Sequence, residues 1–237
     1  MKNNMKHYAY ESPFKMKDSE GVEYILEVET DYNPDSPREW SNLCTMICWH
    51  SRHSIGDRHG FSDPLDFMMD LYREVMDESW FDKHESDNWS DILQTLQESN
   101  LILIKAIQLY DHSGLTVSTS DGYPYNDRWD SGTVGFIYVT KKKLFEECIG
   151  MVEETWKEQA ERYIEDEIET YDQYLRGDVY GYELTKKVTV QDTCPHCGEV
   201  IREYEDEVED DSCWGFYGDC LEENGILDHL GGLEFID

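Results

Sequence analysis

Basic side chains are scarce in this sequence. Its 237 residues include 20 Lys and Arg against 53 Asp and Glu, which gives a formal net charge of −33 and a pI near 4.3. Such a charge repels nucleic acid and anionic membranes, and it attracts cations and basic protein surfaces. We therefore expect no direct binding to nucleic acid or to a membrane. The expected partner is a protein with a basic surface.

Long apolar runs are also missing. No stretch approaches the ~20 apolar residues of a membrane-spanning helix. The N-terminal MKNNMKHYAY lacks the apolar core of a signal peptide. The number of cysteines, seven, is odd. Together these features predict a cytoplasmic protein with reduced thiols.

The motifs of the commonest enzyme classes are absent as well: the sequence has no P-loop, GxGxxG, GxSxG or HExxH. Asp and His residues do occur on expected turns, where they could bind a metal or act as acid and base. These catalytic candidates are His50, Asp57, Asp111, His112 and Asp178. Asp and His are also ordinary turn and cap residues, so a catalytic role requires the segments to converge in space.

Hydrophobic residues make up 39% of the chain and aromatic residues 13%, which predicts a folded protein with a core. Residues 22–30 alternate between apolar and polar side chains and are expected to form a strand. The runs LILIKAIQLYDH, LTVSTS and TVGFIYVT, joined by short turn segments, favour an antiparallel meander. No internal repeat interrupts this pattern, which predicts a single α+β domain over residues 1–237.

Several helices are expected. SNLCTMICWHSRH is expected to form a short one, and Asp63 followed by Pro64 starts another. Residues 141–176 read as helical, with a break at Gly150, and a last helix is expected over about residues 220–230. The long second piece carries an acidic ridge made of Glu154, Glu158, Glu161, Glu165, Glu169 and Asp172. Such a ridge could occupy a phosphate-binding groove of another protein, or it could be an ordinary solvated face.

The sharpest local signal is Cys194-Pro-His-Cys197-Gly, which lies between two expected strands. Two thiolates in a tight turn that ends in Gly can face one Zn²⁺ at ~2.3 Å. Cys213 and Cys220 are the expected further ligands. Residues 188–207 are therefore expected to form a small zinc-knuckle hairpin with a structural zinc. A redox pair and a plain turn are the alternatives.

The stretch DSCWGFYG, residues 211–218, is rich in aromatic side chains. Trp214 and Phe216 are two positions apart, and side chains alternate between the faces of a strand, so these two are expected to share one face. Gly215 and Gly218 would let the backbone approach another segment closely. Trp214 is counted among the expected partner-binding residues.

Five segments together resemble a known group of proteins: SPREWSNLCTMICWHSRHSIGD, LYDHSG, WDSGTVGFIYVT, YDQYLRGDVYGYEL and DSCWGFYG. The group consists of short acidic proteins of bacteriophages, plasmids and gut bacteria that carry REWDNLGTM, YDHSG, WDSGQVG and DSCWGFYG in this order. The resemblance covers roughly residues 31–219 and implies a mobile-element setting, but it carries no activity over. Ser41 stands where the group has an acid. Members without a CPHC turn keep DSCWGFYG, which argues against Cys213 as an obligatory zinc ligand.

These observations predict a phage or mobile-element accessory protein that binds and inhibits a host defence or DNA-handling protein by mimicking the charge of nucleic acid. The alternative is a small-molecule-binding or metal-dependent enzyme that uses the Asp and His residues on turns. A purely structural or regulatory protein is a third possibility. The discriminating observation is whether the five catalytic candidates meet in one pocket.

Overall fold

The computed structural model describes residues 6–76, 88–112, 114–119 and 131–236. They form an α+β structure with two antiparallel sheets. The chain divides into two compact units: unit 1 combines residues 1–35 with 177–237, and unit 2 is residues 36–176. The single domain expected over residues 1–237 stays a prediction.

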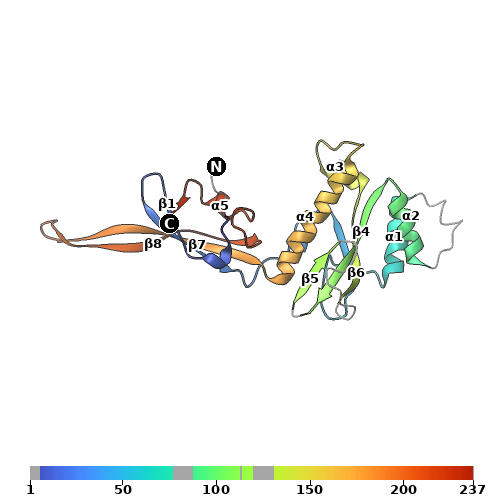
Figure 1. Cartoon of the computed structure of the whole chain (residues 1–237), viewed down its shortest axis with the longest axis horizontal. Helices are drawn as coiled ribbons and strands as arrows, with labels where there is room; N and C mark the ends of the chain where they lie inside the picture. Colours follow the sequence, from blue (N-terminus) through green and yellow to red (C-terminus); the bar gives the residue numbers. More distant parts are fainter. Residues whose placement is uncertain (1–5, 77–87, 113, 120–130, 237) are drawn as a thin grey trace. The chain divides into compact units, whose positions relative to one another are not determined.

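Unit 2 is built on a four-stranded sheet with the strand order β3–β6–β4–β5 (Figure 1). The strands are β3 (Thr45–Cys48), β4 (Ile102–Asp111), β5 (Leu115–Ser118) and β6 (Ser131–Thr140). The expected meander, which would place β5 between β4 and β6, is wrong. β5 has only four residues and lies at the edge, whereas the ten-residue β6 pairs with β4 in the middle of the sheet.

Helices cover both faces of this sheet (Figure 1). One face packs against α1 (Pro64–Val75) and α2 (Trp89–Glu98), and the other packs against α4 (Trp156–Arg176). α3 (Lys141–Glu147) follows β6, and the 3-10 helix η2 (Pro37–Glu39) precedes β3. Within the described ranges, no helix is both long and apolar enough to cross a membrane.

The short helix expected in SNLCTMICWHSRH is wrong, because this segment contains β3. Ile47 packs against the α1–α2 layer, while Met46 and Cys48 pack against the α4 layer. A strand that is buried on both faces has a continuous apolar run, which is hard to tell from a helix. The other helix predictions in unit 2 are confirmed: the Asp63 side chain caps α1 by accepting the Asp66 N–H at 2.9 Å, and α3 and α4 are separate helices.

Unit 1 is a five-stranded sheet with the order β8–β7–β2–β1–β9. The strands are β1 (Phe14–Lys17), β2 (Glu23–Thr30), β7 (Val179–Thr193), β8 (Val200–Tyr217) and β9 (Glu234–Phe235). The alternation expected in β2 is confirmed, because Tyr24, Leu26 and Val28 are buried. They share a core with the 3-10 helix η1 (Ala9–Glu11) and with α5 (Ile226–His229), which is shorter than the helix expected there.

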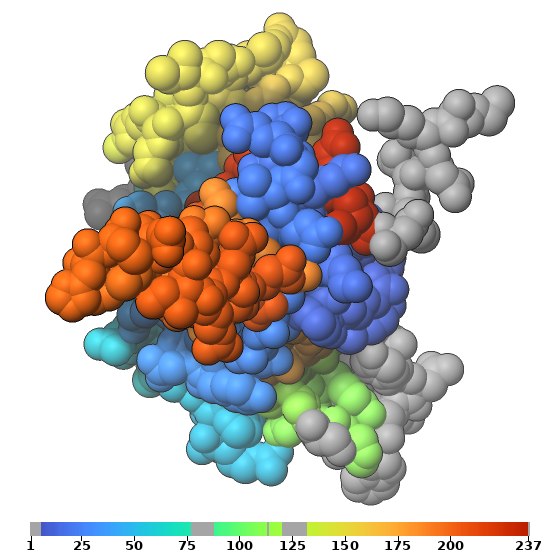
Figure 2. Space-filling view, turned by 90° about the vertical axis from the view of Figure 1, so that its left-hand side faces the viewer, coloured from blue at the N-terminus to red at the C-terminus, as the bar shows by residue number. Residues whose placement is uncertain are grey.

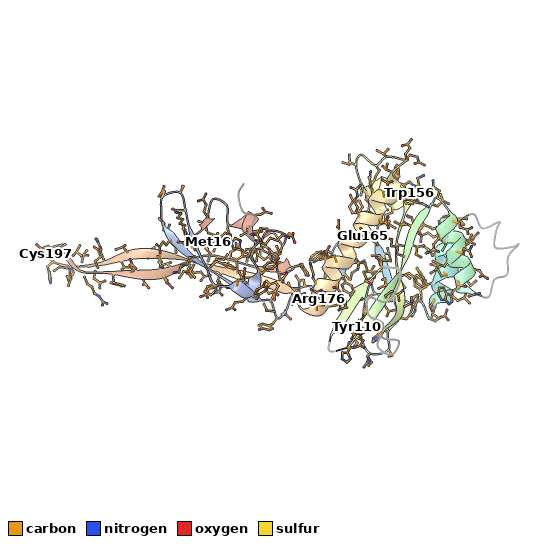
Figure 3. All side chains as sticks on the ribbon, viewed as in Figure 1. Met16, Tyr110, Trp156, Glu165, Arg176 and Cys197 are labelled. Carbon is orange, nitrogen blue, oxygen red and sulfur yellow. The ribbon has the colours of Figure 1, made fainter. Side chains whose placement is uncertain are left out.

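The strands β7 and β8 extend well beyond the rest of their sheet (Figure 1). β2 accompanies β7 only as far as Lys186. From there to the turn at Cys194–Gly198, the described residues pair β7 with β8 alone. We call this two-stranded extension, residues 187–207, the ribbon. Figure 3 shows Cys197 at its far end, away from Met16 in the core of the same unit.

Candidate functional site

The densest group of acids in the described chain lies on β8 rather than on a helix. Seven of the nine residues from Glu203 to Asp211 are acidic and none is basic. All seven acids are exposed on the edge strand β8, and one of them, Asp211, accepts the Tyr182 hydroxyl at 2.6 Å. We call this stretch the acidic β8 segment. The acids are Glu203, Glu205, Asp206, Glu207, Glu209, Asp210 and Asp211.

The acidic β8 segment approaches the charge density of a nucleic-acid strand. At ~3.4 Å per residue it spans roughly 27 Å, which gives about one acid per 4 Å. One strand of DNA carries a charge about every 3.4 Å of helix axis. Two bases on β7 offset part of this charge: Lys186 lies opposite Val208, and Lys187 lies opposite Glu207 and pairs with Glu23 at 3.0 Å.

The electrostatic environment of these two lysines is strongly negative. The hydrogen bond and the charge of Glu23 raise the pKa of Lys187, and Glu205 and Glu207 add to the rise. The pKa of Lys186 is raised by Tyr24 and, further away, by Asp210. The lysines therefore remain protonated at neutral pH, and the surface keeps a net negative charge around them.

The turn at the tip of the ribbon places two cysteines three positions apart in a hydrogen-bonded loop. The Cys194 N–H donates to the Glu199 carbonyl at 2.8 Å, and the Gly198 N–H donates to the Cys194 carbonyl at 2.9 Å. Gly198 has φ +75°, a left-handed conformation that favours glycine. The backbone N–H groups of His196 and Cys197 lower the pKa of Cys194, and the Cys197 thiol adds to the shift.

The four cysteines predicted to bind zinc do not come together. Cys213 lies opposite Tyr182, eleven ladder positions or roughly 36 Å from the pair Thr193–Val200 beside the turn. Cys213 packs at the edge of the unit 1 core, and Cys220 is buried beside the bridge that joins it to Tyr8. Among the described residues, no group of three or more His, Cys, Asp or Glu is arranged to hold a metal ion.

Trp214 does not share a face with Phe216. The register between β7 and β8 shifts at Gly215, which has φ +90°, so the parity of the strand changes there. Phe216 enters the unit 1 core, while Trp214 stays 45% exposed. Trp214 covers Gly181, where a side-chain Cβ would lie 2.1 Å from the indole ring. The exposed edge of the Trp214 ring remains accessible to a partner.

The acidic ridge expected on the long helix is present on α4, but part of its charge is already neutralised. Glu158, Glu161, Glu165 and Glu169 are exposed. Lys105 on β4 pairs with Glu161 and lies 3.7 Å from Glu165. The two ends of the expected row differ from this middle part. Glu154 precedes the helix, while the Asp172 carboxylate accepts the Val117 N–H at 2.8 Å and lies 3.4 Å from Arg176.

Two of the five catalytic candidates meet in unit 2. His50 Nε2 lies 3.9 Å from the Asp111 carboxylate, which also pairs with Arg52. His50 Nδ1 accepts the N–H of His53 at 3.1 Å, so the Nε2 atom is the one that carries the proton in the neutral ring. Burial lowers the pKa of His50, the nearby His53 and Arg52 lower it further, and Asp111 opposes the shift. His112 follows Asp111, and its ring lies 6.0 Å from that of Tyr110.

Asp57 belongs to a different group, which holds unit 2 together. Arg38 binds it through two hydrogen bonds of 2.8 and 3.0 Å and binds Glu167 of α4 through one of 2.7 Å. Asp57 also accepts the Met46 N–H at 2.8 Å. We call Arg38, Asp57 and Glu167 the Arg38 cluster. Asp178 belongs to unit 1, where its carbonyl accepts the Gly218 N–H at 2.9 Å.

Sequence reasoning missed the acidic β8 segment as a surface and Arg38 as the partner of Asp57. The first had a usable signal, since EYEDEVEDD stands in a stretch expected to be a strand. The second had none, because Arg38 and Glu167 are 129 positions apart. No protein-family model, curated protein or solved structure matches the chain. The resemblance to acidic proteins of mobile elements therefore stays a prediction.

Proposed function

We propose that this protein binds a basic, nucleic-acid-binding surface of a host protein and blocks it by presenting a row of carboxylates in place of phosphates. The observation that supports this most is the acidic β8 segment, which holds seven exposed acids in nine residues on an uncovered edge. A charge of −33 would speed the approach to a basic partner by long-range attraction. The setting proposed for this activity is a phage or other mobile element acting in a bacterial cytoplasm.

Protection of the sheet edge is not a sufficient reason for so many acids. An exposed edge strand must be kept from pairing with other chains, and a few charged side chains achieve this. The acidic β8 segment has far more charge than that purpose needs, and the repulsion among its acids lowers the stability of the ribbon. We therefore assign the partner surface to the acidic β8 segment, with the α4 ridge and Trp214 as further contacts.

Two variants with equal charge separate these surfaces. The first changes four acids of β8 to Gln, and the second changes four acids of α4 to Gln, so that each has a net charge of −29. The β8 set is Glu203, Glu205, Glu207 and Glu209, and the α4 set is Glu158, Glu161, Glu165 and Glu169. Because the total charge is the same, any difference between the variants reports the position of the charge.

The measurement is association with an immobilised panel of purified basic DNA-binding proteins, with and without competing duplex DNA. The unchanged protein should compete with DNA, and its association rate should fall as salt shortens the Debye length from ~10 Å at 0.1 M to ~3 Å at 1 M. The β8 variant should associate about tenfold more slowly than the α4 variant. Equal association rates for the two variants would show that the acidic β8 segment is not the partner-binding surface. Submicromolar binding of the protein itself to duplex DNA would contradict mimicry altogether.

We also propose that the Cys194–Cys197 turn holds a structural zinc ion, which would make the end of the ribbon a zinc knuckle. The support is the donor set: two cysteines three positions apart in one turn, a backbone hydrogen bond from the Gly198 N–H to the Cys194 carbonyl, and a left-handed glycine that closes the turn. Zinc would also stabilise the ribbon, because an isolated two-stranded hairpin is marginally stable in water. Metal analysis after purification without chelators tests this. Protein free of zinc would contradict it.

A second candidate function rests on His50 and Asp111. An imidazole that is 16% exposed beside a carboxylate can act as a general base, because its lowered pKa keeps the ring neutral. Asp57, another of the catalytic candidates, binds Arg38 instead. Loss of an in-vivo phenotype in Asp111→Asn, with the phenotype intact in the β8 variant, would favour this candidate over mimicry.

A further inference from the structure

The zinc knuckle proposed at the ribbon tip is incomplete within one chain. A structural zinc ion takes four ligands in a tetrahedron, usually from cysteine and histidine. The turn supplies the sulfurs of Cys194 and Cys197, and the part of the chain that the structure describes adds no third ligand to them. A zinc ion bound there would need two further ligands from outside this turn.

The other cysteines of unit 1 cannot reach the tip without dismantling the sheet. Cys213 is fixed by its place in the β7–β8 ladder, roughly 36 Å away, and Cys220 is buried. Cys197, in contrast, is exposed at the end of the ribbon, as Figure 3 shows. Figure 2 looks onto this tip (orange), and its atoms stand uncovered in that view. A second molecule therefore has free access to Cys197, and Cys194 beside it is partly exposed.

We propose that two copies of this chain meet tip to tip and share one zinc ion, with Cys194 and Cys197 of each copy as the four ligands. The proposal rests on the zinc site proposed above and adds the identity of the missing ligands. A twofold axis through the ion places the same two sulfurs on either side, and such closed pairs are the commonest symmetric assembly. The ion replaces the protons of four thiols, which pass to solvent, and the resulting site has a net charge of −2.

Apolar side chains beside the turn support an approaching second copy. Val200 is 51% exposed and Ile201 is 69% exposed, and they are the first two residues of β8, separated from the turn by Glu199. Successive residues of a strand point to opposite sides, so each side of the ribbon has one apolar group at its end. A second tip that docks end to end would shield these groups from water, which nothing else in the described structure does.

Electrostatics favours the tip as the place where two such acidic chains meet. Two molecules with a charge of −33 each repel strongly if their sheets approach. The ribbon extends about seven residues beyond Lys186, or ~23 Å, so contact between tips keeps the two five-stranded sheets at least twice that distance apart. The Debye length at physiological salt is ~8 Å, and the repulsion between the sheets is largely screened over that separation. Beside the tip, Arg202 lies opposite Asp192 and offsets its charge, while the Glu199 carboxylate, 3.7 Å from the Cys197 sulfur, adds one negative charge per copy.

The test measures mass and metal content of the full-length protein under a non-metal-binding reductant, with Zn²⁺ added stepwise. Native mass spectrometry and light scattering should show conversion from the 28.0 kDa chain to twice that mass, complete at half an equivalent of zinc. A chelator should reverse the conversion, whereas raising the salt should not. Titration with Co²⁺ should give the absorption of a tetrahedral thiolate site with the same endpoint.

Matched cysteine variants locate the contact. Cys197→Ser should remain a monomer and lose at least 90% of the bound zinc, while Cys213→Ser should dimerise like the unchanged protein. Circular dichroism of Cys197→Ser should match that of the metal-free protein, which excludes a folding defect as the cause. A monomer with one zinc per chain would overturn the shared site while leaving the zinc knuckle intact. Absence of zinc from every sample would overturn both.

Discussion

Removal of the Arg38 guanidinium should cost unit 2 more stability than the loss of any exposed charge. The Arg38 side chain is 4% exposed and donates hydrogen bonds of 2.7 to 3.0 Å to Asp57, Glu167 and the Cys44 carbonyl. Burial opposes its charge, but the contacts with Asp57 and Glu167 outweigh burial and raise the pKa of Arg38. Arg38→Ala would leave two carboxylates, 24% and 15% exposed, close together without their cation.

Breaking a buried ion pair by removing one partner costs about 3–5 kcal/mol. The lower end applies here, because the carboxylates keep some contact with water and still accept the N–H groups of Met46 and Cys44. A loss of ~3 kcal/mol raises the population of the locally open state about a hundredfold. Arg38→Lys should give an intermediate loss, since an ammonium group keeps the charge but not the two-pronged contact.

Amide hydrogen exchange at Met46 is the suitable assay, because its N–H donates to Asp57 and reports opening of unit 2 alone. A chain with two compact units need not unfold in one transition, so a global denaturation curve would be harder to interpret. Arg58→Ala is the control, as its side chain is 96% exposed and lies 3.9 Å from Glu39. If the two variants exchange within fivefold of each other, the Arg38 cluster does not hold unit 2 together, and Asp57 returns to the catalytic candidates.

Three further measurements test other parts of the structure. Titration of His50 by NMR should give a pKa below the ordinary value for histidine. Asp111→Asn should lower the pKa of His50 further, because the Asp111 carboxylate favours the charged ring. An unchanged His50 pKa in this variant would contradict the contact. Gly135→Ala should destabilise unit 2 by several kcal/mol, because the added Cβ would lie 2.1 Å from a backbone oxygen of β3. Gly132→Ala is the control and should be neutral, because its Cβ would meet nothing within 4 Å. Equal stabilities of the two variants would refute this packing. Burial raises the pKa of Cys48 to about 12, so this thiol should resist alkylation in the native protein. Cys194 and Cys197 at the tip should react. Early labelling of Cys48 would show that the core of unit 2 opens.

Elements with one buried face could be predicted from the sequence. The alternation in β2 and the apolar stripe of α4 each have the period of their structure, because water covers the opposite face. Local capping signals were equally informative, as the Asp63–Pro64 start of α1 shows. In these cases a short window of sequence contains the physical cause of the element.

Elements whose form depends on distant segments could not be predicted. β3 was expected to be a helix, because its three buried residues in a row have no alternation once helices cover both faces of the sheet. The order β6–β4–β5 depends on the equal length of β4 and β6, ten residues each, which lets them pair along most of their length. No local sequence pattern indicates this pairing. The bulge at Gly215 separates Trp214 from Phe216, although their parity in the sequence places them on one face.

The candidate sites divide in the same way. The CPHC turn could be located from the sequence because its two cysteines are three positions apart. The expected zinc site with Cys213 assumed a compact fold, and the long ladder between β7 and β8 rules this out. The acidic surface was assigned to α4 because acids at helical spacing are easy to recognise. Only the three-dimensional structure reveals that Lys105 lies against that ridge, while the acids of β8 stand on an uncovered edge.

The ribbon is a feature that stability alone does not explain. The ribbon adds no residue to the buried core of unit 1. Its apolar residues Val200 and Ile201 are exposed to water, and the acids that follow them on β8 repel one another. A two-stranded hairpin of this kind is marginal without support, and deleting residues 187–207 would leave the contacts of the unit 1 core in place. Local features that conflict with stability are expected at functional sites, where the compensating interaction comes from a ligand or a partner. We propose a shared zinc ion in this role at the tip of the ribbon, and a basic surface in this role at the acidic β8 segment. Both proposals therefore make the same demand: deletion of the ribbon should leave both units folded while it abolishes dimerisation and partner binding together.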